Sequence, residues 1–266
     1  MDILEEIGKR SVHDLIAKGI RLDNRKLLEY RKIKLQKNVV PNANGSALCK
    51  LGKTQVLAGI KFGLGSPYAD KPDEGAISFN AEFTGLASPT FEIGPPNENA
   101  IELARVVDRG FRSSGIIDLK KFFINEKNVL VLYVDLHVLD FDGNLFDACY
   151  LATMTALKNT RMPKVEVDNE NKTAKIIYGE FDKNLELNGI VTSSTFAVVK
   201  DKIMLDPTQL EESAMDSGIV IAVDGENLNA IQKLGFDGLT KEQILQMVDI
   251  TFEKHKELRK IIENTD

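Results

Sequence analysis

The feature that most restricts the fold is the stretch of residues 128–143, NVLVLYVDLHVLDFDG, which alternates with the two-residue period of a β-strand. Its apolar residues would lie on both faces of that strand, with Val129, Val131 and Tyr133 on one side and Leu130, Leu132 and Val134 on the other. A strand that is apolar on both faces is typical of the interior of a covered sheet. We therefore predict a central strand buried on both sides, for which the rest of the chain must supply neighbouring strands and covering layers.

The other predicted elements follow an order that occurs twice. In the first half, amphipathic spacing predicts helices over residues 3–18, 97–115 and 145–159, and alternation predicts strands over residues 29–40, 42–63 and 77–89. The second of these strand ranges would hold two strands that turn at Gly52 and Lys53. A loop is expected at 64–75 and a charged connector with a hairpin at 164–188.

The second half repeats this plan, with two strands in 190–207, two more in 217–235 and a terminal helix over 239–264. Strands followed by helices, twice, favour the α+β class with two similar β-sheet/helix halves.

The helix predicted over residues 97–115 has an apolar face and a basic face. The apolar face is expected to pack against a core and holds Ile101, Ala104, Val107 and Phe111. The basic face holds three arginines at i, i+4 and i+7, namely Arg105, Arg109 and Arg112. At about 100° per residue their side chains fall within an arc of roughly 60°. We call this feature the arginine ridge.

The arginine ridge has two interpretations. It is an ordinary solvated helix face if Glu102 pairs with Arg105 and Asp108 pairs with Arg112. However, Arg105 and Arg109 are like charges one turn apart, which costs roughly a few tenths of a kcal/mol, and an anion from outside the helix would relieve that repulsion. A guanidinium presents a rigid fork of donors that suits phosphate better than an ammonium does. The ridge is therefore a candidate anion-binding surface.

Composition limits what such a surface could bind. The 266 residues carry a formal net charge of −6 and give a pI near 5.3. Non-specific coating of nucleic acid needs a broadly positive field. A polyanion would therefore have to bind locally, at a feature such as the arginine ridge.

Cysteine usage and the N-terminal sequence bear on the compartment. Cys49 and Cys149 lie in apolar stretches with no CxxC and no His cluster, so we expect buried thiols in a reducing compartment. The first residues, MDILEEIGKR, lack the order of a signal peptide, and no apolar run approaches the roughly 18 residues that cross a bilayer. We expect a cytoplasmic protein with no membrane partner and no cofactor.

A series of motifs resembles those of the RNase PH-like superfamily, in the same order over roughly residues 20–255. The run GSALCKLGKTQVLAGIKFG (45–63) resembles the strand pair that opens the core of these proteins. The run RLDNR (21–25) is similar to their Arg-x-Asp-Gly-Arg entry motif, with Asn24 in place of the usual glycine. Three further runs resemble their first long helix, their central strand with the second helix, and the aspartate-bearing strand end of the second half: ENAIELARVVDRGFRSS (98–114), VDLHVLDFDGNLFDACYLATMTAL (134–157) and MLDPTQLEE (204–212).

Within the superfamily, ENAIELARVVDR and LDPTQLEES look most like the non-catalytic RNase PH-like ring subunit of the archaeal exosome. The resemblance implies an RNase PH-like fold with an N-terminal helix and entry turn (1–28), a first RNase PH-like half (29–163), a connector (164–188) and a second half with the C-terminal helix (189–266). It also implies a hexameric ring of three heterodimers with a catalytic RNase PH-like partner, S1/KH-type RNA-binding cap subunits, and single-stranded RNA that the ring degrades from the 3′ end with phosphate.

Two departures from the active members of the superfamily bear on activity. Those members end the central strand in Asp-Gly-Gly-(Ser/Thr)-Arg, which holds the attacking phosphate, whereas this chain has the run DGNLF over 142–146. They also carry an arginine-rich stretch before the first long helix, whereas the run GPPNEN over 94–99 contains no arginine. Leu145 and Phe146 cannot donate a hydrogen bond to phosphate. Because phosphorolysis depends on positioning and charge stabilisation of the phosphoryl group, we expect no catalytic residue in this chain.

Asp206 and Glu212 occupy the places of the family's two second-half carboxylates. Paired carboxylates can perform acid–base chemistry when their surroundings separate their pKa values. Without a phosphate cradle, the favoured interpretation is that Asp206 anchors the turn before Pro207.

The remaining candidates have structural interpretations. The three histidines lie apart from one another, so no metal site is expected at His13, His137 and His255. The loop 64–75, with Lys71 as its cation, corresponds to the loop that reaches the central channel in ring members and could touch passing RNA, although a surface loop is the simpler interpretation.

The favoured hypothesis is a non-catalytic subunit of the exosome core ring that shapes the partner's active site and binds RNA through Arg105, Arg109 and Arg112. The sequence leaves open which of these arginines contact RNA and which contact a neighbouring subunit. The alternative is a self-sufficient phosphate-dependent 3′-to-5′ exoribonuclease with Asp206 and Glu212 as catalysts. A third hypothesis is an unrelated α+β protein that only oligomerises.

Overall fold

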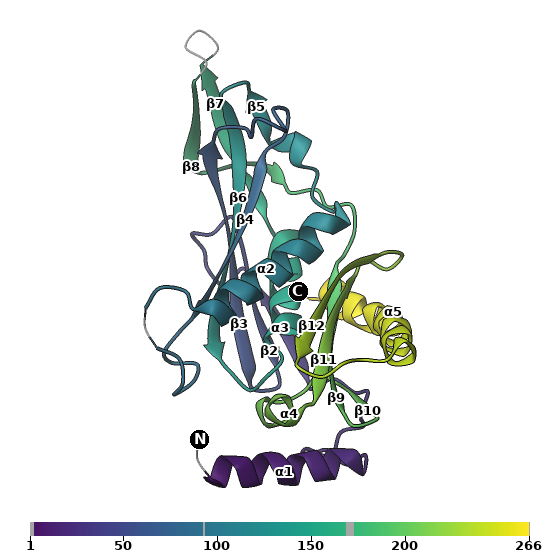
Figure 1. Ribbon diagram of the computed structural model, residues 1–266. Coiled ribbons are helices and arrows are strands. Elements are labelled where there is room, and N and C mark those ends of the chain that lie inside the picture. The colour runs from purple at the N-terminus through teal and green to yellow at the C-terminus, as the bar shows by residue number, and fades with distance from the viewer. Residues whose placement is uncertain (1–2, 93, 169–172, 266) are drawn as a thin grey trace.

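The structure is a computed structural model that describes residues 3–92, 94–168 and 173–265 (Figure 1). Its helices are α1 (Ile3–Ala17), α2 (Glu98–Ser114), the 3-10 helix η1 (Leu119–Phe122), α3 (Leu145–Lys158), α4 (Gln209–Ala214) and α5 (Lys241–Glu263). Its strands are β1 (Ile33–Lys37), β2 (Gly45–Leu51), β3 (Thr54–Gly65), β4 (Ala76–Phe83), β5 (Phe123–Asn125), β6 (Asn128–Asp140), β7 (Arg161–Asp168), β8 (Thr173–Asn184), β9 (Thr192–Val199), β10 (Lys202–Leu205), β11 (Ser217–Val223) and β12 (Leu228–Gly235). This mixture confirms the α+β class.

The first half is a mixed sheet with strand order β1-β2-β3-β6-β4, and β5 also pairs with β6. The first three strands form the antiparallel run expected from their short turns, and Gly52 makes the turn between β2 and β3 with a φ of 61°. β6 pairs antiparallel with β3, where Val134 lies opposite Ile60, and parallel with β4. β6, which was predicted to be the central strand, therefore lies in the interior of the sheet.

The prediction that β6 is buried on both faces was wrong. Its inner face is buried along its length, through Leu130, Leu132, Val134, Leu136 and Val138. On its outer face Tyr133 is 37% exposed and Leu139 is 36% exposed. Apolar alternation on both faces indicates an interior strand, but the described part of this chain covers the second face only near its start, at Val129, and leaves Tyr133 and Leu139 exposed.

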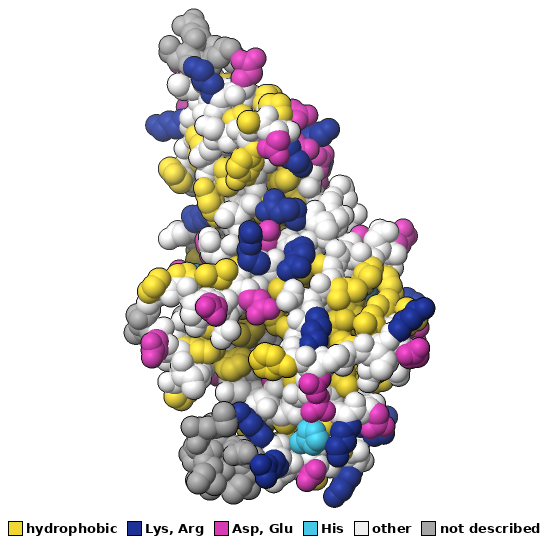
Figure 2. Space-filling model, viewed as in Figure 1, with side chains coloured by type: hydrophobic (Ala, Val, Ile, Leu, Met, Phe, Trp, Pro, Cys, Tyr) yellow, Lys and Arg dark blue, Asp and Glu magenta, His cyan; other side chains and the backbone are white. Residues whose placement is uncertain are grey.

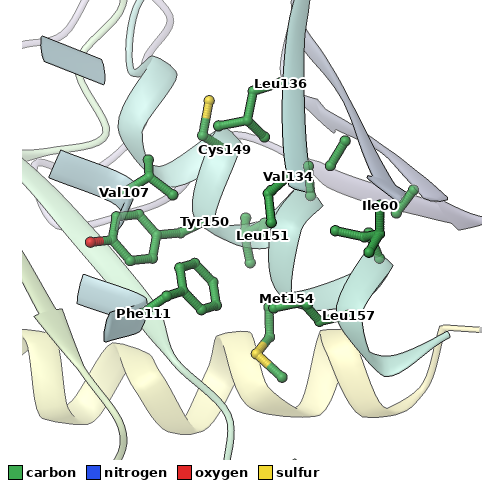
Figure 3. Packing of buried hydrophobic residues seen from close by; sticks show 14 of the residues in the cluster. Ile60, Val107, Phe111, Val134, Leu136, Cys149, Tyr150, Leu151, Met154 and Leu157 are labelled. Atoms are coloured by element: carbon green, nitrogen blue, oxygen red, sulfur yellow. The ribbon is translucent and has the colours of Figure 1, made fainter. Parts of the chain in front are cut away.

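Helices α2 and α3 lie between the two sheets and fill the main core (Figure 1). Figure 3 shows Val107 and Phe111 of α2 packed against Tyr150 of α3, while Ile60 and Val134 of the first sheet close the other side of α3. The rings of Phe111 and Tyr150 are stacked with centroids 5.3 Å apart. Ala148, Ala152 and Ala156 follow one another at one-turn spacing on α3 and are fully buried, because these small side chains let β2 and β3 approach α3.

The second half is an antiparallel sheet with strand order β10-β9-β11-β12. One of its faces packs against α5 through Phe196, Ile219, Ile221 and Met247. Its other face meets the start of α3 and, through Ala197 and Val199, the helices α1 and α4. The order of layers is thus first sheet, α2 and α3, second sheet, and α5.

Several strands and helices begin or end at residues other than those predicted. The strand expected over 77–89 ends at Phe83, because Ala87 donates its backbone N–H to the Thr84 carbonyl and closes a turn there. The strand expected over 29–40 is confined to β1. The hairpin expected in the connector is confirmed by the pairing of β7 with β8, and the turn residues 169–172 lie outside the described residues. The short helix α4 was not predicted.

Candidate functional site

The arginine ridge lies on a helix whose ends follow from local sequence signals. Asn97 caps α2 at its N-terminus, where its side chain accepts a hydrogen bond from the backbone N–H of Ala100 at 2.9 Å. Gly115 ends the helix with a φ of 63°, a left-handed conformation that glycine adopts without steric cost. The predicted limits of this helix are therefore confirmed.

The structure brings Arg105, Arg109 and Arg112 together along one exposed hollow of about 440 Å³, which also includes Asp108 and Ser113. All three arginine side chains are exposed. Figure 2 shows basic side chains gathered on the face of the molecule that α2 crosses. The common face predicted from their spacing is confirmed.

The three arginines differ in their partners. Arg112 forms an ion pair with Asp108 at 2.7 Å and donates to the Ile77 carbonyl at 3.0 Å. Arg109 donates to the side-chain carbonyl of Gln232 on β12 at 3.2 Å. Arg105 has no hydrogen bond or ion pair with any residue in the described part of the chain. Its guanidinium is therefore the most available cation of the ridge.

Two details of the predicted helix surface were wrong. Glu102 does not pair with Arg105 and instead accepts a hydrogen bond from Gln232 at 3.1 Å, because β12 packs beside α2. Ile101 is 53% exposed rather than buried. The buried stripe of α2 is centred on Leu103 and Val107, so at about 100° per residue Ile101 falls on the arginine side of the helix.

A second cluster of polar residues is buried where the two halves meet the N-terminal segment. Asp206 at its centre is fully buried and has a φ of 52°. Its carboxylate accepts hydrogen bonds from the backbone and the guanidinium of Arg31, both at 2.7 Å, from Arg25 at 3.0 Å and from the side chain of Asn144 at 2.7 Å. Asp206 was expected to anchor its own turn. Its side chain instead contacts the N-terminal segment through Arg25 and the first half through Arg31 and Asn144.

The turn between β6 and α3 is held closed by this cluster. Arg31 donates to the carbonyls of Asp142 at 2.6 Å and Gly143 at 3.2 Å, and the Thr54 hydroxyl donates to the Gly143 carbonyl at 2.7 Å. A Cβ on Gly143 would lie 2.5 Å from the backbone N of Gln209. The backbone of this turn therefore touches the start of α4 directly, with no room between them for a bound anion.

Asn144 and Asp147 continue the cluster into α3. Asn144 caps the helix in a left-handed conformation with a φ of 52°, and its side chain donates to Asp147 at 2.9 Å. Asp147 is fully buried and accepts further hydrogen bonds from the hydroxyls of Ser193 and Thr195 at 2.6 and 2.9 Å. Burial raises the pKa of the Asp147 carboxyl. These contacts join α3 of the first half to β9 of the second.

Glu212 lies at the edge of the same turn. It accepts a hydrogen bond from the backbone N–H of Asn144 at 2.7 Å. Burial raises the pKa of its carboxyl to about 7, although the Asn144 bond and the charge of Arg31 act in the opposite direction. Glu212 and the neighbouring Leu145 and Phe146 line a separate apolar pocket of about 430 Å³.

The other predicted candidates are dispersed. Lys71 forms an ion pair with Glu74 at 2.9 Å, so the loop cation is already paired. His13 lies 3.3 Å from Asp216, His137 lies 3.3 Å from Glu82, and His255 is buried with its Nδ1 2.9 Å from the Thr192 hydroxyl. In the described residues, no three His, Cys, Asp or Glu side chains are grouped as they would be around a metal ion. Cys49 and Cys149 are buried free thiols, and none of the described helices is long and apolar enough to span a membrane.

No role was predicted from the sequence for the charged residues that connect these buried segments. Arg21 is 1% exposed and bonds to Glu211 through its Nε at 2.9 Å, across 190 positions of sequence. Arg31 and Asp147 were likewise not selected. The available signal was a charged residue inside an apolar or turn-forming stretch, and that signal alone does not identify a partner so distant in sequence.

Two sheets that enclose a pair of helices, joined by buried carboxylates at the β6–α3 turn, define a two-domain protein of the RNase PH type. The chain belongs to the 3′ exoribonuclease family, whose domain 1 matches residues 29–163 and whose domain 2 matches residues 189–254.

Full-length relatives make the similarity more specific. The chain is 43% identical to the exosome complex component Rrp42 of Methanothermobacter thermautotrophicus over 97% of its own length and 95% of that protein. It is 42% identical to Rrp42 of Thermococcus gammatolerans over 98% of this chain and 96% of that protein. Among solved structures, a chain of the Archaeoglobus fulgidus exosome with RNA bound to the active site superposes with a TM-score of 0.85 and 40% identity, covering 97% of this chain and 99% of that chain. A chain of an archaeal exosome core gives a TM-score of 0.82 and 36% identity, with 98% of each chain covered.

Proposed function

We propose that this chain is a non-catalytic ring subunit of an RNA-degrading exosome. Similarity over nearly the whole length to proteins named Rrp42 and to chains of archaeal exosome structures supports this proposal. In the proposed assembly the chain forms a heterodimer with a catalytic RNase PH-like subunit, three heterodimers close a hexameric ring, and S1/KH-type RNA-binding subunits cap it in the cytoplasm. The chain contributes its N-terminal segment (1–28), first half (29–163), connector (164–188) and second half (189–266) to that ring.

The observation that carries the non-catalytic role is the closed turn between β6 and α3. In active relatives the corresponding turn is expected to hold the attacking phosphate with backbone amides, a hydroxyl and a guanidinium. Here the amide of Asn144 donates to Glu212, and Arg31 donates to carbonyls of the same turn. Leu145 and Phe146 occupy the places of the hydroxyl and the guanidinium. The side chains of Leu145 and Phe146 offer a phosphate dianion no hydrogen-bond donor, and the dianion would meet the carboxylates of Asp206 and Glu212, so the chemistry is assigned to the partner.

The arginine ridge supplies the RNA-binding part of the proposal. Arg105 is unpaired within the described chain, and Arg109 has only a neutral partner. Exposed guanidiniums along one hollow fit the phosphates of a single strand. Arg112 is already paired with Asp108, so its contribution is the smallest of the three.

The test is the rate of RNA degradation by the complex reconstituted with the catalytic partner. Changing both Arg105→Glu and Arg109→Glu is expected to slow phosphate-dependent shortening of the RNA, because two contacts become repulsive. The matched control carries Lys256→Glu and Lys260→Glu, which have the same spacing on the exposed side of α5 and the same charge change. An unaltered rate in the arginine variant would show that the ridge has no such role.

A self-sufficient exoribonuclease is the second candidate, favoured only by the carboxylate pair Asp206 and Glu212, since a carboxyl with a pKa of about 7 suits a general acid. Incubating the purified chain alone with RNA, magnesium and phosphate tests it. We expect no nucleoside diphosphate to be released, and its release would establish this alternative instead.

A further inference from the structure

The apolar pocket beside the closed turn is the most distinctive hollow that the proposed function does not use. It has a volume of about 430 Å³ and is lined from both halves of the molecule. The first half contributes Phe83, Phe91, Leu103, Phe141, Leu145 and Phe146, and the second half contributes Met215 and Leu234. The pocket therefore lies beside the closed turn, between the two halves, and its walls are those of a site for an uncharged ring.

Three of the phenylalanines form a continuous aromatic wall. The rings of Phe83 and Phe91 are stacked with centroids 4.6 Å apart and planes inclined by 25°. The ring of Phe91 lies 5.3 Å from that of Phe141, with planes inclined by 32°. All three side chains are only partly buried, so part of their ring surface faces the hollow. Such a wall offers a flat ligand a stacking surface.

The charged groups of the pocket are carboxyl groups, which accept hydrogen bonds and repel anions. The ionisable residues among those that line it are both acids, Glu102 and Glu212. One oxygen of Glu212 accepts from Asn144, and the other has no hydrogen-bond partner in the described part of the chain. Asn99 adds an amide on the α2 side. This arrangement favours a ring with an amino donor and disfavours phosphate inside the pocket.

The pocket adjoins the arginine ridge. Gln232 of β12 connects them, because its side chain accepts from Arg109 at 3.2 Å and donates to Glu102 at 3.1 Å. Arg105 follows Glu102 by one turn of α2, and Figure 2 shows exposed apolar side chains next to the basic ones on this face. A strand held by its phosphates at the ridge would thus have a base pocket within one helical turn.

We propose that this pocket binds a single unstacked nucleobase that carries an exocyclic amino group, while the attached phosphates remain outside. The ring stacks on the aromatic wall, and its amino group donates to Glu212. The base is part of the RNA held at the arginine ridge, and to that extent the inference rests on the proposed function. A free nucleoside carries the same base and is the alternative ligand.

The first experiment uses the complex with the catalytic partner and three probes: adenosine, ribose 5-phosphate, and a short oligoadenylate with or without abasic positions. Adenosine is expected to bind and ribose 5-phosphate is not. The variant Phe91→Ala is expected to abolish adenosine binding and to weaken oligoadenylate binding about tenfold, as expected for loss of one base-stacking contact. The abasic oligonucleotide is expected to bind equally to the wild type and to the variant. If only free adenosine responds to the variant, the occupant is the nucleoside.

A measurement on the unaltered chain covers the case in which Phe91→Ala fails to fold. RNA containing 8-azidoadenosine is photocrosslinked to the complex, and the attached peptide is identified by mass spectrometry. We expect attachment within residues 83–91 or 141–146. Attachment only elsewhere would overturn the pocket assignment.

The outcomes separate this inference from the proposed function. The pair Arg105→Glu and Arg109→Glu should weaken RNA binding but leave adenosine binding intact. If the arginine variant weakens RNA binding while adenosine does not bind the wild type, the pocket inference fails and the proposed function stands. If the arginine variant binds RNA normally and adenosine does not bind the wild type, both the pocket inference and the proposed function fail. If Phe91→Ala impairs only assembly with the partner subunit, the pocket receives a protein side chain and the inference is wrong.

Discussion

Asp206 shows how a single residue determines the geometry of the buried polar cluster where the two halves meet the N-terminal segment. It adopts a left-handed φ of 52°, which is costly for a residue other than glycine, and it does so while fully buried. Five hydrogen bonds donated by Arg31, Arg25 and Asn144 offset that cost. Asp206 thus connects the N-terminal segment, the first half and the second half of the chain.

Replacing Asp206 with asparagine should destabilise the fold strongly. Asp206→Asn keeps the shape but takes the nearer anion from the guanidinium of Arg31, which is 8% exposed, and leaves it only the carboxylate of Asp142 at 3.7 Å. Breaking a buried ion pair from one side typically costs about 3–5 kcal/mol. The free energy of unfolding from urea titrations measures the effect. Asp108→Asn, which breaks the exposed pair with Arg112, is the control and should cost at most about 0.5 kcal/mol. Equal losses in the two variants would refute the structural role of Asp206.

Glu212 should make stability depend on pH in the acidic to neutral range. Its folded-state pKa of about 7 is raised above the ordinary value of 4.5, so between these values the folded state binds more protons than the unfolded state. Stability from this group therefore falls as pH rises from 4.5 to 7 and is constant above, with a total change of at most about 3 kcal/mol. In Glu212→Gln the unfolding free energy should fall less between pH 5 and pH 7 than in the wild type. Parallel pH profiles for the two proteins would show that the carboxyl titrates normally.

At the scale of single elements, α2 carries the arginine ridge only because its opposite face packs closely on α3. Gly110 lies at the closest approach, where a Cβ would meet the hydroxyl oxygen of Tyr150 at 1.9 Å. The Tyr150 hydroxyl also donates to the Val106 carbonyl at 2.9 Å, which fixes the two helices relative to each other. The direction of the arginines is thus set by packing on the far side of their own helix.

The variant Gly110→Ala tests this contact. The added methyl group must displace the Tyr150 ring, so despite the better helix propensity of alanine we expect a loss of about 1–3 kcal/mol in unfolding free energy. Gly8→Ala in α1 is the matched control, because a Cβ there meets nothing within 4 Å, and it should be neutral or stabilising. Adding Tyr150→Leu to Gly110→Ala should recover part of the loss. A neutral Gly110→Ala variant would mean that the helices are not in this contact.

At the scale of the whole molecule, the sequence predicts what depends on short-range periodicity and misses what depends on distant partners. The helix limits of α2 and the alternation of β6 follow from residues a few positions apart, so the fold class was predictable. The exposed outer face of β6 was not predictable, because exposure depends on whether another layer covers it. The arginine ridge was predictable from spacing on one helix. The pocket was not predictable, since its lining runs from Phe83 to Gly235.

The acidic character of the molecule leads to a prediction about its interaction with RNA. With a net charge of −6, the chain presents a local cationic surface, the arginine ridge, rather than a general positive field. If Arg105 and Arg109 each neutralise one phosphate, replacing both with glutamine should reduce the slope of log affinity against log salt concentration by about 1.4 units for a single strand. Oligoadenylate titrations of the reconstituted complex between about 50 and 200 mM salt measure this slope. Lys18→Gln, an exposed charge just beyond α1, should leave the slope unchanged. The same slope in the double arginine variant and in the wild type would mean that the ridge contacts a neighbouring subunit instead of RNA.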